Sequence, residues 1–385
     1  MKQFKLTEVA DLVADRTPAF TGLKKFASTG AVDDAEIFSC EEVTYENRPS
    51  RADLITKVDD ICFARMQGTL KVFIINQTNC EYLFSTGFAI LRPNKSLIFP
   101  RYLFHLIKSI EFQIKKDSLC TGATQKAITN DKLKTIEIIL PSIQDQKKIA
   151  LILDKSSEII VKRKLTITKL DELVQSIFAD MFGDLSGNSK NWPDKLLGDV
   201  LDQITYGLTV RPKYIENGIP LVSAREIKDG YVNLQNAPRI SIADFNNLSN
   251  KSKAKVGDIL FSKTGSIGHS ALVGSIEEFA ISQNAARLSF DKKTVNNVYA
   301  LYYLRSKGIQ DLAKRSAIGN AVKDLQLGVM KRFPFPLPPM DLQILFAKKI
   351  IKLNFIKEKS VQDFSKHSHL IASLQNQAFA TKLAT

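Results

Sequence analysis

The sequence predicts a mixed α/β (α+β) protein with two similar domains, each followed by a long helix. Three observations predict this architecture. The same short sequence blocks occur twice in the same order, strand and helix patterns follow one another within each copy, and a long heptad pattern follows each copy. We therefore expect a pseudo-two-fold internal duplication whose two long helices pair as an antiparallel coiled coil.

The duplication is recognised from five blocks that recur in register. The block KVDDICFAR at Lys57–Arg65 matches KVGDILFSK at Lys255–Lys263, an offset of 198 residues. Four further blocks recur at an offset of 197, and five blocks in one order are not expected between unrelated domains. The four blocks pair Ser85, Ala89 and Leu91 with Ser282, Ala286 and Leu288; Tyr102, Ile107, Lys108 and Ser109 with Tyr299, Leu304, Arg305 and Ser306; Gly122, Lys126 and Ile128 with Gly319, Lys323 and Leu325; and Leu140, Pro141, Gln146 and Ala150 with Leu337, Pro338, Gln343 and Ala347.

Within each copy, local patterns predict the elements of an α/β domain. The two Asp-Ile-x-Phe blocks read as strands, and Ile136–Leu140 reads as a further strand of the first copy. The aromatic-rich segments Pro100–Ser109 and Val298–Ser306 read as short helices. Prolines at 141 in the first copy and between 334 and 339 in the second end these domains.

A long helix with a heptad repeat follows each domain. Apolar residues alternate spacings of four and three, interrupted at Ser156 and Arg163 in the first helix and at Lys357, Ser360 and His367 in the second. The predicted boundaries are 1–141 for the first domain, 142–183 for the first helix, 184–338 for the second domain and 339–385 for the second helix. The expected coiled-coil core consists of Ile149, Leu153, Ile160, Ile167, Leu170, Val174, Ile177, Phe346, Ile350, Leu353, Phe364, Ile371 and Leu374. The alternative is that each helix is buried in a separate core, which would leave the shared heptad frame unexplained.

Composition favours an acidic partner and a cytoplasmic protein. The formal net charge is +14, and the excess lies mainly after residue 190. Nucleic acid is the commonest partner of a basic soluble protein. No apolar run approaches the roughly 18 residues of a membrane span, and the first residues lack a secretory signal.

Motifs for catalysis are missing from the sequence. It has no phosphate-binding GxxxxGK[ST] loop, no GxGxxG after a strand, and no Asn/Asp-Pro-Pro-aromatic tetrapeptide of amino-methyltransferases. We therefore expect no enzyme activity, no metal site and no cofactor in this chain. Pro193-Asp194 with Glu226-Ile227-Lys228 could suggest a nuclease, but the gap is wide and the first copy has no counterpart.

One loop after the repeated strand could bind nucleic acid. In Gly265-Ser266-Ile267-Gly268 the paired glycines would let the main chain approach a phosphate, although a tight hairpin turn is an equal alternative. Its counterpart Gln67-Gly68-Thr69 lies between Arg65 and Lys71. Both loops therefore offer amide and cationic groups at an equivalent place.

Several stretches together resemble the specificity (S) subunit of type I restriction-modification systems, over nearly the whole chain. They are YENRPSR from Tyr45, VDDICFARMQGT from Val58, STGFA from Ser85, Leu140-Pro141, VGDILF from Val256, TGS from Thr264 and ISQNAAR from Ile281.

The resemblance implies two target-recognition domains, each reading one half of a bipartite target in double-stranded DNA. It implies that the paired helices hold the domains apart and dock two modification (methyltransferase) subunits. Those partners would carry S-adenosylmethionine and methylate adenine, and a motor-nuclease restriction subunit could complete the assembly. This chain would be a non-catalytic subunit.

The candidates for DNA binding are side chains that can reach base edges or neutralise phosphates. They are Arg65, Gln67, Lys71 and Lys126 in the first domain, and Arg211, Lys213, Arg225, Lys263, Ser266 and Lys323 in the second. A competing hypothesis is a coiled-coil structural adaptor with only non-specific DNA affinity.

Overall fold

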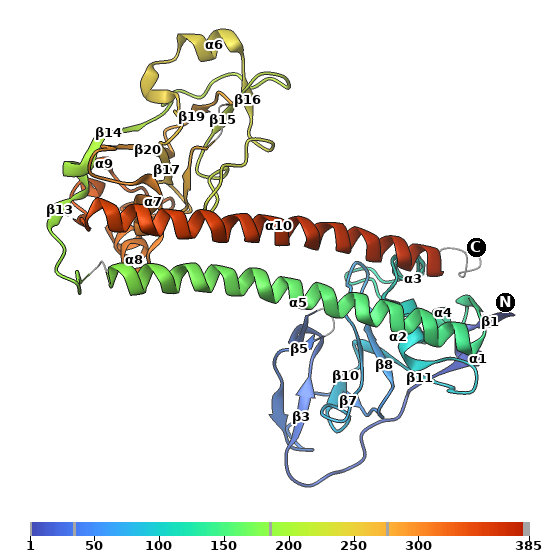
Figure 1. Ribbon diagram of the computed structural model, residues 1–385. Coiled ribbons are helices and arrows are strands. Elements are labelled where there is room, and N and C mark those ends of the chain that lie inside the picture. The colour runs from blue at the N-terminus through green and yellow to red at the C-terminus, as the bar shows by residue number, and fades with distance from the viewer. Residues whose placement is uncertain (1, 34–35, 185–186, 275–276, 380–385) are drawn as a thin grey trace. The chain divides into compact units, whose positions relative to one another are not determined.

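The computed structural model describes residues 2–33, 36–184, 187–274 and 277–379 (Figure 1). The chain divides into two compact units, one formed by Met1–Leu165 and Val361–Thr385 and the other by Thr166–Ser360. Each unit thus contains one globular domain and part of both long helices. The predicted boundaries at 141, 183 and 338 divide the chain in a different way, into linear segments, and they stay a prediction. Residues 185–186 and 380–385 of the predicted segments lie outside the described residues.

The first domain contains three main sheets and short helices. Its sheets have the orders β2-β11-β8-β9, β6-β3-β10-β7 and β1-β12. The strands are β1 (Lys2–Lys5), β2 (Ala10–Leu12), β3 (Lys24–Ala27), β4 (Val32–Asp33), β5 (Glu36–Ile37), β6 (Glu41–Val43), β7 (Ala52–Leu54), β8 (Ile61–Ala64), β9 (Val72–Ile74), β10 (Leu83–Ser85), β11 (Phe88–Pro93) and β12 (Glu137–Leu140), and the helices are α1 (Leu6–Val9), α2 (Pro100–Lys108), α3 (Ile110–Ser118) and α4 (Asn130–Leu133).

The second domain repeats this plan with other loops. Its sheets have the orders β14-β20-β17-β18, β16-β15-β19 and β13-β21. The strands are β13 (Asp194–Leu196), β14 (Leu201–Tyr206), β15 (Ile219–Val222), β16 (Arg239–Ile240), β17 (Ile259–Ser262), β18 (Ser270–Leu272), β19 (Ala280–Ile281), β20 (Ala285–Phe290) and β21 (Pro334–Pro336), and the helices are α6 (Ile242–Asn247), α7 (Asn297–Arg305), α8 (Lys307–Ser316) and α9 (Leu327–Met330).

The two domains share their central sheet and its register. The repeated Asp-Ile-x-Phe blocks form β8 and β17, and the segments predicted as short helices form α2 and α7. Leu91 of β11 lies opposite Ile61, and the equivalent Leu288 of β20 lies opposite Ile259. The predicted fold class and the internal duplication are therefore confirmed.

Both faces of the repeated strand are buried, which explains its continuous apolar run. In β8, Ile61 and Phe63 join the core that contains α2, while Cys62 and Ala64 join a second core that includes β10. In β17 the same alternation separates Ile259 from its neighbour Leu260. A strand covered on both sides needs apolar residues at every position.

Each long helix spans 40 residues, α5 from Ile143 to Phe182 and α10 from Met340 to Phe379. At 1.5 Å per residue, each is about 60 Å long. All thirteen predicted core positions are buried or half-buried, whereas most positions between them are exposed. The sequence pattern therefore identified the packed face of both helices. Among the described residues, no helix combines the length and the apolar character that crossing a membrane requires.

The helices pair in an antiparallel sense within each unit. In the first unit, Arg163 Nη1 lies 3.3 Å from Asp363 Oδ2 across the pair. In the second, Lys357 Nζ lies 2.5 Å from Asp171 Oδ1, and the Phe178 and Phe346 rings are 5.3 Å apart. Higher numbers on α5 thus face lower numbers on α10. Arg163 and Lys357, which interrupt the apolar pattern, form ion pairs between the helices.

Each domain is completed by the end of the helix that belongs to the other repeat. Phe182, at the end of α5, packs on Tyr299 of α7 with the ring centroids 4.8 Å apart. The equivalent Phe379, at the end of α10, packs on Tyr102 of α2 at 5.5 Å. Gly183 ends α5 with φ of +76°, as expected for a glycine C-cap. Each core therefore contains residues from both repeats.

A buried glutamine joins the start of each long helix to its own domain. Gln146 Oε1 accepts from the Phe99 N–H at 2.8 Å, and its amide donates to the carbonyls of Leu97 and Pro141. Gln343 makes the equivalent three bonds with Asn296, Thr294 and Pro338. Both glutamine side chains are buried, and each satisfies its own polar atoms on main-chain groups of the domain that precedes it.

A second contact at the same place differs between the repeats. In the first unit, Arg101 Nε of α2 donates to Asp154 Oδ2 of α5 at 2.9 Å, and His105 Nε2 lies 2.7 Å from Asp154 Oδ1. In the second, the equivalent region is aromatic, with the Tyr302 and Phe346 rings 5.4 Å apart. The first contact is therefore ionic and the second is apolar.

We predict that Gln146→Ala loosens the first domain and Gln343→Ala the second. Each change removes a partner from three main-chain groups, which costs about 1 to 3 kcal/mol per group left unsatisfied. Hydrogen–deuterium exchange should accelerate around Phe99 in the first variant and around Asn296 in the second. Gln144→Ala, at an exposed position of the same helix, is the control. Equal exchange in all three variants would contradict this account.

We also predict that the first unit loses stability on mild acidification through His105. Burial lowers the pKa of His105, more than Asp154 raises it. As the pH falls through about 6.5, the unfolded chain therefore binds a proton before the folded chain does, and stability falls by up to about 1.4 kcal/mol per pH unit. Thermal unfolding of the wild type and of His105→Gln between pH 7.5 and 5.5 measures this. A variant with the same pH dependence as the wild type would refute the assignment to His105.

Asp154 does not contribute in that window. Burial raises the pKa of Asp154, but its bonds with Arg101 and His105 outweigh burial and hold the pKa below the ordinary 3.8. The stability that this carboxylate contributes is present above its ordinary pKa and is lost only in stronger acid.

Candidate nucleic-acid interface

Two loops meet at an equivalent place in each domain. One follows the repeated strand, β8 or β17, and the other follows helix α3 or α8. The Gln67 N–H donates to the Lys126 carbonyl, and the Gly265 N–H donates to the Lys323 carbonyl, both at 2.9 Å. The structure therefore brings together Arg65, Gln67, Lys71 and Lys126 in the first domain and Lys263, Ser266 and Lys323 in the second, as the repeat suggested.

A glycine in each second loop permits this close approach. Gly122 and Gly319 have φ of +136° and +118°, which residues with a side chain rarely adopt. A Cβ atom would lie 2.5 Å from the Gln125 carbonyl oxygen at the first position and 2.3 Å from the Val322 carbonyl oxygen at the second. Both repeats therefore require a glycine at this position to form the loop.

Arg65 braces the first domain from a half-buried position. Its Nε donates to the Phe88 carbonyl at 2.9 Å and its Nη1 to the Ile128 carbonyl at 3.2 Å. Burial lowers the pKa of this guanidinium. Because two of its donor nitrogens already hold the main chain, Arg65 joins β11 to the second loop. A base contact by Arg65 stays a prediction.

Lys263, the counterpart of Arg65, is 8% exposed and forms an ion pair with Asp324. Thr264 Oγ1 donates to the same carboxylate. Burial alone would raise the pKa of Asp324, but these two partners lower it. Lys263 therefore has a partner within the domain, and a DNA contact by Lys263 stays a prediction.

The other loop candidates are more accessible. Lys126, Lys323 and Ser266 are exposed at the equivalent loops. Gln67 is also exposed and donates from Nε2 to the Asp117 carbonyl at 3.3 Å. Lys71 is half-buried and donates to the Thr29 carbonyl at 2.8 Å.

Three second-domain candidates lie on earlier connections of the chain. Arg211 and Lys213 are exposed between β14 and β15, where the Arg211 guanidinium lies 5.6 Å from the centre of the Tyr214 ring. Arg225 is exposed between β15 and β16. These three side chains do not belong to the pair of loops described above.

The alternative nuclease residues have structural partners. The Glu226 carboxylate is buried and accepts from the Ser223 N–H and hydroxyl at 2.8 and 2.6 Å, which holds a turn. Asp194 accepts from Asn188 Nδ2 at 2.8 Å. Among the described residues, no group of three His, Cys, Asp or Glu side chains is placed to hold a metal ion.

Comparison with known proteins shows the family. A family model described as the type I restriction modification DNA specificity domain matches residues 1–169 and again residues 189–357. The chain belongs to this family. It carries the specificity domain twice, which agrees with the internal duplication and with the resemblance found in the sequence.

Individual relatives agree with this assignment. The chain is 22% identical over 313 residues to the specificity subunit of the type I restriction enzyme EcoBI from Escherichia coli, a match that covers 74% of this chain and 65% of that protein. A solved chain from a study of assembly and conformational transition in a type I R-M system is 21% identical, with a TM-score of 0.64 over 98% of this chain and 97% of that one. The type I S subunit of M. genitalium is 15% identical, with a TM-score of 0.59 over 98% and 96% of the two chains. The two structures show a shared fold.

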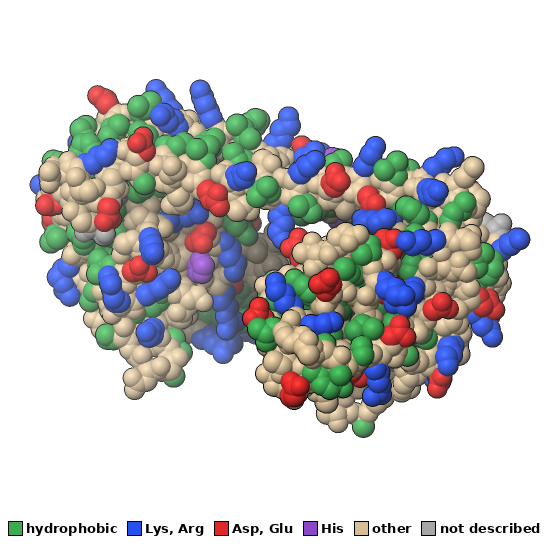
Figure 2. All heavy atoms as spheres, turned by 90° about the horizontal axis from the view of Figure 1, so that it is seen from below, with side chains coloured by type: hydrophobic (Ala, Val, Ile, Leu, Met, Phe, Trp, Pro, Cys, Tyr) green, Lys and Arg blue, Asp and Glu red, His purple; other side chains and the backbone are tan. Residues whose placement is uncertain are grey.

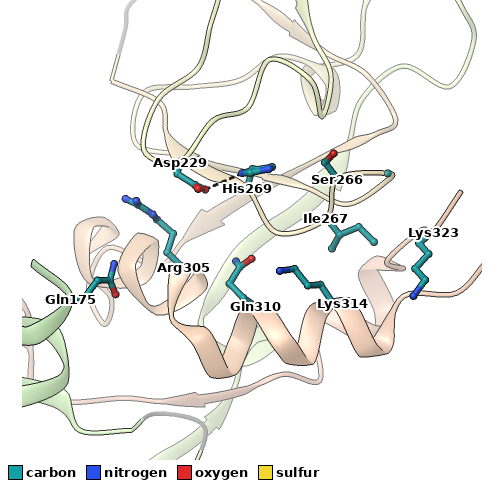
Figure 3. A pocket seen from close by; sticks show the side chains of 10 residues that line it. Gln175, Asp229, Ser266, Ile267, His269, Arg305, Gln310, Lys314 and Lys323 are labelled. Atoms are coloured by element: carbon teal, nitrogen blue, oxygen red, sulfur yellow. Dashed lines mark hydrogen bonds and ion pairs between the residues drawn. The ribbon is translucent and has the colours of Figure 1, made fainter. Parts of the chain in front are cut away.

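The specificity domain of the second repeat contains a basic cavity that the sequence did not reveal. It has a volume of about 660 Å³ and is lined by Ser266 and Lys323 together with Arg305, Gln310 and Lys314. Figure 3 shows Gln310 and Lys314 projecting from α8 toward the loop that carries Ser266. Arg305 was already part of a repeated block, and the basic last turns of α7 and α8 were the available signal.

We predict that Arg65→Met destabilises the first domain by about 1 to 3 kcal/mol, because the carbonyls of Phe88 and Ile128 lose their donors. The matched change Lys126→Met, at an exposed position, should alter stability by less than about 0.5 kcal/mol. Hydrogen exchange of β11 measures the difference. If the amides of β11 exchange at the same rate in both variants, Arg65 does not brace the domain.

Proposed function

We propose that this chain is the DNA specificity subunit of a type I restriction-modification complex in the cytoplasm, and that it has no catalytic activity of its own. The observation that carries the proposal is the duplication of a specificity domain, each copy followed by a helix whose end completes the other copy. Such a chain has two equivalent DNA-reading surfaces, which suits a bipartite target.

Charge and loop chemistry support binding of double-stranded DNA. The chain has a net charge of +14, and exposed lysines stand at equivalent loops of both domains. Lysine and main-chain amides position a protein on phosphates, while amide side chains such as Gln67 can read base edges. This combination favours a DNA reader over a structural adaptor whose charge is incidental.

The long helices offer two equivalent surfaces for modification subunits. Ile159 is 42% and its counterpart Ile356 49% exposed, and the equivalent Leu173 and Leu370 are 44% and 55% exposed. In Figure 2, hydrophobic side chains stand among Lys, Arg and acidic side chains along the visible long-helix surface. Single exposed apolar residues are common on protein surfaces, but these recur at matching positions of both repeats, which favours a shared interface. Two such sets favour two modification subunits, which would supply S-adenosylmethionine and the adenine methylation chemistry, and a motor-nuclease restriction subunit could join them.

The proposal predicts sequence-selective binding to a bipartite site. The chain, assembled with modification subunits, should retain a subset of duplexes from a library of random half-sites at varied gaps. Affinity should fall steeply with salt, because bound phosphates release counterions. A structural adaptor predicts no selected sequence and little salt dependence, and either result would count against the proposal.

The helices should also set the distance between the half-sites. Removing one heptad from each, residues 160–166 and 360–366, shortens each helix by about 10 Å and takes out Arg163 together with its partner Asp363. We expect the tolerated gap to change while both half-site sequences stay the same. Selection from the same library measures both, and an unchanged gap would exclude this role for the helices.

Docking is tested by stoichiometry. Ile159→Glu with Leu370→Glu, both in the first unit, should weaken the binding of one modification subunit. Leu173→Glu with Ile356→Glu, both in the second unit, should weaken the binding of the other, so that native mass spectrometry detects one copy in place of two. Lys155→Glu with Lys169→Glu, at exposed positions of α5, controls for added negative charge. Two bound copies in all variants would place the docking surface elsewhere.

A further inference from the structure

The basic cavity of the second domain has the chemistry of an anion site. Arg305, Lys314 and Lys323 line it, while its acidic side chain, Asp229, already pairs with His269 at 3.1 Å. All of these residues belong to one compact unit. Figure 3 shows the Asp229–His269 pair on the far side of the cavity from Lys323. Among the described residues, no acidic side chain pairs with these three cations, although the Arg305 guanidinium lies 5.1 Å from the centre of the Tyr302 ring.

Two side-chain hydrogen bonds hold the loop over this cavity. Ser262 Oγ donates to the Ser266 carbonyl at 2.6 Å, and Gln310 Nε2 donates to the Gly268 carbonyl at 2.8 Å. Gly268 has φ of +112°, and a Cβ there would lie 2.0 Å from Gln310 Oε1. Among the described residues, none accepts a hydrogen bond from the Ser266 N–H. The loop therefore presents a main-chain amide donor in the wall of the cavity that the three cations line.

In the first domain, the equivalent amide donates a hydrogen bond to a carboxylate. There the loop amide in the place of Ser266 is that of Gly68, and it donates to Asp117 Oδ2 at 3.0 Å. Asp117 occupies the position of Lys314 at the repeat offset of 197 residues. The neighbouring Lys116 is buried, lies 3.3 Å from the Asp117 carboxylate, and donates to the carbonyls of Met66 and Thr69. The first domain thus holds its own oxyanion where the second holds a lysine.

We propose that the second domain binds a DNA phosphate at the Ser266 amide with Arg305, Lys314 and Lys323, and that Asp117 closes the equivalent place in the first. This inference rests on the proposed DNA-binding function. An amide donor and three cations that line one cavity favour a charged phosphate, because charge-assisted hydrogen bonds are stronger than neutral ones. Only the second domain then gains a backbone anchor at this position.

The test compares Lys314→Asp with Arg315→Asp in the full chain. Both residues are exposed on α8 and both changes reverse one charge, but only Lys314 lines the cavity. Affinity for a fixed non-specific duplex is measured over a range of salt concentrations. Lys314→Asp recreates the carboxylate of the first domain, so we expect at least a tenfold loss at low salt. The slope of log K against log salt should become shallower by about 0.9 for each phosphate that the variant no longer neutralises. Arg315→Asp should change affinity less than about threefold and leave the slope unchanged.

A second variant, Lys314→Gln, removes the cation without adding a carboxylate, and we expect an intermediate loss of affinity with a slope that changes in the same direction. Melting curves establish that each variant is folded. If the wild type binds DNA but Lys314→Asp and Arg315→Asp lose equal affinity with equal slopes, the cavity is not a phosphate site, although the proposed function stands. If the wild type shows no salt-dependent affinity for DNA, the proposed function itself fails, and this inference fails with it.

Discussion

An amphipathic helix cannot bury its apolar stripe alone, and this constraint organises the molecule. The chain has two such helices, α5 and α10, and in each unit they pair in opposite directions. Antiparallel pairing puts the end of one helix beside the start of the other. Each domain therefore receives the start of its own helix through Gln146 or Gln343, and the end of the other through Phe379 or Phe182. The core of each unit depends on both repeats, so neither repeat contains all the residues of one core.

The contacts that join domain and helix are shared in part and different in part. The glutamine bonds are the same in both units. In the first unit Asp154 contacts Arg101 and His105, whereas in the second the Tyr302 and Phe346 rings pack edge to face. If an ionic surface packed against an aromatic one, the buried charge would have no partner, which is costly. The start of α5 therefore fits the first domain better than the second, and the start of α10 fits the second better than the first. This difference disfavours a misfolded chain in which each helix start packs on the wrong domain.

Much of the fold could be predicted from the sequence, because hydrophobic period and repetition are local signals. The strand blocks correspond to β8 and β17, and the heptads identified the packed face of both long helices. The candidate site was predictable only in outline. The repeat indicated that Arg65 and Lys263 occupy equivalent places, but the partners of a cation depend on segments far away in sequence, such as Asp324 for Lys263. The cavity beside Lys314 could not be predicted for the same reason, because it forms where α8 meets a loop more than forty residues earlier in the chain.

The two domains also show how a recognition surface can change on a constant scaffold. Gly122 and Gly319 hold the same loop in the same backbone conformation, and the same main-chain bond joins the paired loops in both domains. On this common frame, Asp117 and Lys314 stand at one position with opposite charge, and Arg65 and Lys263 have different partners. Because the frame is fixed by glycines and main-chain bonds, a side chain at the loop surface can change without disturbing the core. A duplicated chain built this way can acquire two different readers, while the helices keep both readers in one protein.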